Sequence, residues 1–141
     1  MTITHELIIE APVPDVWALT VDVEAWPAMT PTITSVQRLD TGPLRVGSTA
    51  RIKQPGQSAR IWTVTTLEPN EAFAWETKVF GMRMIGGHRL EQVGEGCRNV
   101  LSVGMSGALS GIVEGLLERQ LRKTIATENE GFRRAALAAH Q

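Results

Sequence analysis

Apolar and polar residues alternate along the first ten positions of the chain. Ile3, Leu7 and Ile9 fall on one face of an extended backbone. A period of two is typical of a half-buried β-strand. We expect this strand to end at Ala11-Pro12-Val13-Pro14, because proline has no backbone N–H to donate to a sheet.

Two short helical segments are predicted after this strand. Asp15 stands just before Val16–Thr20, where a carboxylate can pair with the free N–H groups of a first helical turn. The helical pattern continues through Asp22–Ala25, and Trp26-Pro27 is expected to close it.

The middle of the chain consists of short runs rich in β-branched and aromatic residues. Turn signals containing glycine, proline or asparagine separate these runs at regular intervals, which is typical of strands linked by hairpins. The pattern predicts five or six consecutive strands, placed at Thr32–Leu39, Gly47–Gln54, Arg60–Glu68, Ala72–Phe80, Met82–Val93 and Cys97–Met105.

The last part of the chain has apolar residues at helical spacing. About thirty residues at about 1.5 Å each form a helix of about 45 Å, long enough to span a whole sheet. The apolar stripe rotates from the Leu116 side toward the Ile125 and Phe132 side, so we expect a bend or a diagonal path that keeps the stripe buried. The apolar positions are Leu109, Ile112, Val113, Leu116, Leu117, Leu121, Ile125, Phe132 and Ala136.

Three glycines, Gly107, Gly111 and Gly115, repeat every fourth residue at the start of this helix. Glu114 and Glu118 share their side of the helix, so the repeat is not the small-residue motif of paired membrane helices. Each glycine weakens a helix by about 1 kcal/mol relative to alanine. We therefore expect the entrance of the helix to be able to move.

Bulk properties narrow the classes of function. The chain has 141 residues, 43% of them hydrophobic, and a formal net charge of -1. Such a chain can bury a core without a disulfide or a metal, and Cys97 is its single cysteine. It lacks the basic excess that attracts nucleic acid or anionic lipid. Without a signal-peptide pattern or a long apolar span, we expect a cytoplasmic protein, with the homodimer left open as an oligomeric state.

Several sequence pieces recur together in one family: Ile9-Glu10-Ala11-Pro12 with Val16-Trp17, Asp22 and Trp26-Pro27, Val46-Gly47, Trp62–Pro69, and a histidine in the strand after Gly81. In this order they resemble the START-like (SRPBCC) superfamily, particularly its polyketide cyclase/dehydrase and lipid-transport branch. The resemblance covers residues 1–141 as one ligand-binding domain. It implies an α+β helix-grip fold, a curved antiparallel sheet of about seven strands around a long C-terminal helix, with two short helices after the first strand.

The aromatic residues indicate where a cavity would lie. The chain has four tryptophans and no tyrosine. Trp62 shares a strand face with Val64, and Trp75 shares one with Phe73, which places both rings on the concave side of a sheet. Trp26, beside a proline, is expected in a loop at the cavity entrance. The alternative is that these rings only fill the core.

Flexible apolar side chains extend this set. Methionines such as Met29 and Met84 adapt to ligands of irregular shape, although they fill gaps in a core equally well. The predicted ligand-binding residues are Trp26, Met29, Trp62, Trp75, Met84, His88, Leu101, Leu116 and Leu117.

His88 is the candidate for chemistry. Strand alternation places it on the inner face with Met84 and Leu90, next to Gly86-Gly87, where glycine marks a bulge or a close backbone approach. A neutral imidazole could exchange a proton with a ligand carbonyl or phenol, as cyclisation and dehydration require. The structural alternative is a histidine bonded to a backbone or threonine partner. No inward acidic partner accompanies it, since Glu76 lies on the face opposite to the inner one.

The other charged and imidazole groups are expected to be structural. Arg51, Arg60 and Arg83 alternate with apolar neighbours and are predicted on the convex, solvated face. A shift of the strand register by one residue would turn any of these arginines inward, where it could bind a carboxylate. His5 is the second histidine that can face inward. With His140 as the third, the histidines lack metal-ligand spacing, so no metal is expected.

Three hypotheses follow. The first is a binder of a small hydrophobic molecule, such as a polyketide, a lipid or an aromatic metabolite, without a bound cofactor. The second is a cyclase/dehydrase-type enzyme that uses His88 as general acid or base. The third, a protein-interaction module, requires a large exposed docking face that the pattern does not indicate.

Overall fold

The computed structural model describes residues 2–139. His140, to which the sequence assigned no role, lies outside this range. The elements in chain order are β1 (Thr2–Ile9), α1 (Val13–Val21), the 3-10 turn η1 (Val23–Ala25), α2 (Trp26–Met29), β2 (Ser35–Arg38), β3 (Thr49–Lys53), β4 (Arg60–Glu68), β5 (Ala72–Val79), β6 (Met82–Val93), β7 (Gly96–Ser106) and α3 (Ser110–Ala138).

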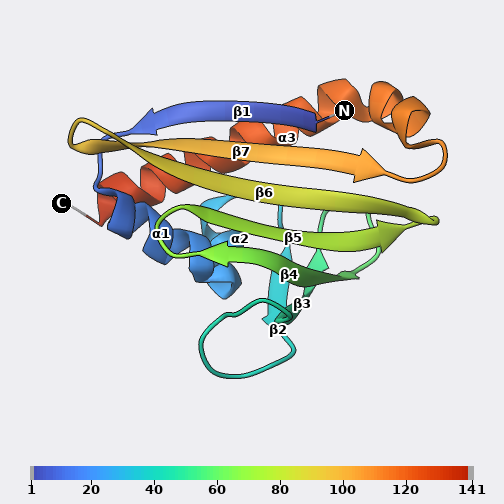
Figure 1. Ribbon diagram of the computed structural model, residues 1–141, viewed down its shortest axis with the longest axis horizontal. Helices are drawn as coiled ribbons and strands as arrows, with labels where there is room; N and C mark the ends of the chain where they lie inside the picture. Colours follow the sequence, from blue (N-terminus) through green and yellow to red (C-terminus); the bar gives the residue numbers. More distant parts are fainter. Residues whose placement is uncertain (1, 140–141) are drawn as a thin grey trace.

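One antiparallel sheet of seven strands forms the body of the molecule, in the order β1-β7-β6-β5-β4-β3-β2. The sheet curves, and α3 crosses it diagonally while the short helices lie at one end (Figure 1). The long helix packs against β1 and β7 and against α1 and α2. The curved sheet with a long C-terminal helix and two short helices after β1 is the arrangement that the sequence predicted.

The predicted strand bounds agree closely with the structure, and β4 and β6 have the expected ends. The helical segments differ more. Trp26-Pro27 begins α2 instead of closing a helix, and α1 begins at Val13, before Pro14. Proline is tolerated in a first helical turn because the N–H it lacks would have no partner there. The prolines therefore mark the starts of these helices.

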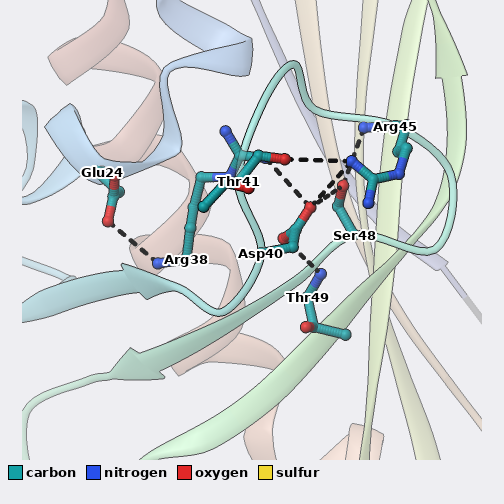
Figure 2. Close-up of polar contacts among 7 residues, drawn as sticks. All are labelled: Glu24, Arg38, Asp40, Thr41, Arg45, Ser48 and Thr49. Carbon is teal, nitrogen blue, oxygen red and sulfur yellow. Dashed lines mark hydrogen bonds and ion pairs between the residues drawn. The ribbon is translucent and has the colours of Figure 1, made fainter.

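The loop between β2 and β3 is held by one carboxylate, Asp40 (Figure 2). Asp40 accepts a hydrogen bond from Ser48 Oγ at 2.9 Å and one from the Thr49 backbone N–H at 3.4 Å. Arg38 and Arg45 pair with it at 3.3 and 3.4 Å. The hydrogen bond from Ser48 is the main cause that lowers the pKa of Asp40, and the Thr49 N–H and Arg38 add to it. The contacts join the loop to the start of β3.

The apolar residues in the first half of α3 predicted which face of the helix is buried, and the structure buries a different face. Leu116 is 80% exposed, whereas Glu114 is completely buried. Successive helical residues are about 100° apart, so Leu116 lies opposite Ile125 while Glu114 shares the side of Phe132. The second half of the helix packs against the core, and the rotation that this imposes carries Leu116 to the outer side. Ile112 is exposed for the same reason, and Leu109, which precedes the first helical residue, is exposed as well.

Close backbone packing joins α3 to α2. Gly131 is buried, and a Cβ atom at this position would collide with the carbonyl oxygen of Met29. The glycine therefore permits the approach of the two helices. Gly115, at the other end of α3, is exposed and has open space around it.

Candidate ligand-binding cavity

A cavity of about 560 Å³ lies between the concave face of the sheet and α3. Cavities of several hundred Å³ are typical of sites for drug-sized molecules. Strands β3 to β7 supply most of the wall, and α3 supplies residues from Val113 to Glu128.

Most of the predicted ligand-binding residues line this cavity: Trp26, Trp62, Trp75, Met84, His88, Leu101 and Leu117. Their part in binding a ligand stays a prediction. Two predicted residues lie elsewhere. Leu116 points away on the outer side of α3, and Met29 packs against the core at the end of α2 without lining the cavity. Both were assigned from residue type, which does not determine how a helix is rotated.

Aromatic rings form the inner end of the cavity. Trp26 packs with its ring centroid 5.1 Å from that of Trp75 and 5.8 Å from that of Phe132. Its indole N–H donates to the Leu19 carbonyl at 3.1 Å, and the ring is buried. The expectation that Trp26 lies in an entrance loop is therefore wrong, because α2 carries the ring into the core.

One glycine of β6, Gly86, lies against two of these rings. Gly86 is paired with Trp75 across the sheet, and a Cβ at Gly86 would touch both Trp75 and Trp62 at 3.5 to 3.7 Å. The ring centroids of the two tryptophans are 5.8 Å apart. These are ordinary van der Waals distances, so a methyl group would fit at this position, but a larger side chain would meet the two rings.

His88 faces the cavity from an aromatic environment. It is 8% exposed, and its ring lies 5.2 Å from that of Trp26 and 5.4 Å from that of Phe132. Its Nδ1 atom has no hydrogen-bond partner among residues 2–139, so the backbone or threonine partner considered above is not found there. Burial lowers the pKa of His88 to about 3, which leaves the imidazole neutral at pH 7.

Glu128 is a second titratable group on the cavity wall, and the sequence reasoning missed it. Its Oε1 atom accepts a hydrogen bond from the Thr32 hydroxyl at 2.9 Å. Burial raises the pKa of Glu128 to about 7, against a smaller lowering by Thr32. The signal was present in the chain, because Glu128 stands three residues after Ile125 and four before Phe132, on the buried side of the helix.

Arg60 also lines the cavity, which corrects its predicted position on the convex face. It begins β4 two residues before Trp62, so alternation places both side chains on the concave side. Ile61 between them is 49% exposed. The prediction treated Ile61 as the inward residue, but the tryptophan determines the register. Arg51 and Arg83 are exposed, as predicted.

His5 has a structural role on the other side of α3. The Nδ2 atom of Asn129 lies 3.0 Å from His5 Nδ1 and donates to the His5 carbonyl at 3.2 Å. Cys97 is a buried free thiol. Among residues 2–139, no three His, Cys, Asp or Glu side chains are arranged to hold a metal ion, and no helix of that range is long and apolar enough to cross a membrane.

A family model described as polyketide cyclase / dehydrase and lipid transport matches residues 1–137. The chain belongs to this family. Its membership in the START-like superfamily, expected from the sequence, is thereby confirmed. No curated protein matches the chain.

Solved structures share the fold over nearly the whole chain. TTHA0849 from Thermus thermophilus is 17% identical, with a TM-score of 0.80 and coverage of 100% of both chains. The Zhui aromatase/cyclase from Streptomyces sp. R1128 is 20% identical, with a TM-score of 0.68 and coverage of 98% of this chain and 97% of that one. A hypothetical protein, jhp0584 from Helicobacter pylori, is 11% identical with a TM-score of 0.82, covering 96% of this chain and 88% of its own. At these identities the likeness establishes the helix-grip fold alone.

Proposed function

We propose that the chain acts as one ligand-binding domain that encloses a small hydrophobic molecule, such as a polyketide, a lipid or an aromatic metabolite, between the sheet and α3. The observation that carries this proposal is the cavity of about 560 Å³ with tryptophan, methionine and leucine side chains on its wall. Removing apolar surface from water is worth about 25 cal/mol per Å², so such a wall favours an apolar ligand. The family's description as cyclases, dehydrases and lipid-transport proteins is consistent with it.

The direct test is to identify what the cavity holds. Native mass spectrometry of the freshly purified protein should detect an added mass of a few hundred daltons that organic solvent extracts. Titration with N-phenyl-1-naphthylamine, a neutral apolar dye, should quench tryptophan fluorescence, because Trp62 and Trp75 line the cavity. A protein that neither carries such a mass nor binds the dye would refute the proposal.

A second candidate function is catalysis of a cyclase/dehydrase type, with His88 as acid or base. It is favoured by the presence of two titratable groups in one cavity, His88 on the β6 side and Glu128 on the α3 side. In a dehydration, a base removes a proton from the carbon next to a carbonyl, and an acid protonates the hydroxyl, which leaves as water. General acid-base catalysis works best when the pKa of the group is near the working pH. The pKa of about 7 for Glu128 suits this task better than the value of about 3 for His88.

A further inference from the structure

We propose that the ligand of this cavity is an apolar acid, and that Arg60 binds its carboxylate. This inference rests on the proposed function, since it names the chemical class of the molecule that the cavity encloses. The apolar body of the acid would lie along Trp62 and Trp75, with the charged end at the first residue of β4.

The position of Arg60 is unusual among the arginines of the sheet. Its side chain is half-buried on the cavity wall, and it forms no ion pair with any residue in the described range 2–139. Arg83, on the convex face, pairs with Glu76 at 3.5 Å, and Arg98 pairs with Glu91 at 3.0 Å. Arg51 and Arg89 also form no ion pair among residues 2–139, but both are exposed to water, whereas the unpaired Arg60 is half-buried on the cavity wall.

The loop before Arg60 is arranged to offer further donors. Lys53 donates its ammonium hydrogens to the backbone carbonyls of Gln54 and Gln57, which holds the loop between β3 and β4 against the sheet. The residues Gln54 and Gln57 line the cavity together with Arg60. Side-chain amides carry N–H groups, so the cavity can add neutral donors to the planar fork of the guanidinium.

The balance of charge favours an anion. Among the described residues that line the cavity, Arg60 is the cation and Glu128 is the one carboxyl group. Burial holds the pKa of Glu128 near 7, so this carboxyl is only partly ionised at neutral pH and cannot fully offset the arginine. A carboxylate would form two parallel, charge-assisted hydrogen bonds with the guanidinium.

The experiment uses the full chain at pH 7.5 and displacement of N-phenyl-1-naphthylamine by matched pairs of competitors. One pair is 2-naphthoic acid and 2-naphthamide, and the other is decanoic acid and decanamide. Each acid should bind roughly tenfold to a hundredfold more tightly than its amide, the range expected for hydrogen bonds to a charged partner. Whichever acid binds with the higher affinity shows whether the cavity fits an aromatic body or an alkyl chain better.

The variants separate charge recognition from folding. Arg60→Gln should abolish the preference for acids while leaving the affinity for amides and dye unchanged, and Arg60→Lys should retain part of the preference. Arg51→Gln is the matched control, an exposed arginine on the neighbouring strand, and should bind like the native protein. An equal loss for acids and amides in Arg60→Gln, or an acid preference that survives this change, would overturn the inference. A native protein that neither binds the dye nor carries a copurifying apolar molecule would instead refute the proposed function itself.

Discussion

The side chains of Asn99 on β7 and Asn129 on α3 are hydrogen-bonded to each other in the core, with 2.9 Å between Asn99 Nδ2 and Asn129 Oδ1. Asn129 also donates from its Nδ2 atom to the backbone carbonyl of Asn99 at 3.0 Å. Both residues are fully buried. Together with the contact between Asn129 and His5, the pair joins β1, β7 and α3 at one point, which determines how the long helix is placed over the sheet.

Replacing Asn129 by leucine should therefore destabilise the protein. The change leaves buried polar groups of Asn99 and half-buried groups of His5 without this partner, and each buried group left unpaired costs about 1 to 3 kcal/mol. Urea denaturation followed by circular dichroism measures the free energy of unfolding. Arg119→Leu, on the exposed side of the same helix, is the control and should change it by less than about 0.5 kcal/mol. Equal stability of the two variants would show that the asparagine pair does not hold the helix.

Two glycines of α3 should respond in opposite ways to alanine. Gly131→Ala should lower the free energy of unfolding by about 1 to 3 kcal/mol, because the added methyl group would force α2 and α3 apart. Gly115→Ala should raise it by up to about 1 kcal/mol, because the residue is exposed and alanine favours helix. Thermal denaturation of the two variants measures both effects. If both changes stabilised the protein, the close packing at Met29 would be wrong.

The exposed and buried apolar residues of α3 should differ in the same assay. Phe132→Ala should cost about 3 to 5 kcal/mol because its ring is buried against Trp26 and His88. Leu116→Ala should cost little, since that side chain is 80% exposed. A large loss for Leu116→Ala would mean that the first half of the helix is buried after all.

The carboxyl of Glu128 makes stability depend on pH. Its pKa is raised from 4.5 to about 7 in the folded protein, so between these values the folded state binds more protons than the unfolded state. The contribution is favourable at low pH and is lost as the pH rises through this window. The free energy of unfolding of native protein relative to Glu128→Gln should consequently fall between pH 4.5 and 7. Urea melts across this range test the prediction, and Glu118→Gln, at a carboxylate paired with Arg122 outside the cavity, is the control.

The choice between carrier and enzyme can be tested at His88. In a carrier, His88→Gln should shift the affinity for a cavity ligand by at most about tenfold, the value of one hydrogen bond. In an enzyme that uses this imidazole, the same change should lower turnover by about a hundredfold to ten-thousandfold and leave binding nearly intact. Glu128→Gln provides the comparison, since its pKa of about 7 makes it the better acid. Turnover unaffected by either change would exclude both groups from the chemistry.

Local periodicity in the sequence was sufficient to predict most of the strands and the side of the sheet on which their large residues lie. The period of two along β4, β5 and β6 correctly placed Trp62, Trp75 and His88 on the concave side. A strand has only two faces, so one large apolar residue determines the side of all the others. The same rule, applied from Trp62 instead of Ile61, would have placed Arg60 in the cavity.

The long helix could be predicted from the sequence, but its rotation could not. A helix offers a continuous range of faces, and the apolar residues of α3 pointed to two of them. Only the tertiary packing decided between these faces. The buried contacts of Gly131, Asn129 and Phe132 fix the rotation of the second half of α3, and the first half follows because the helix is continuous. That choice turned Leu116 to the outside and brought Glu128, which lies on the same side of the helix as Ile125 and Phe132, onto the wall of the cavity.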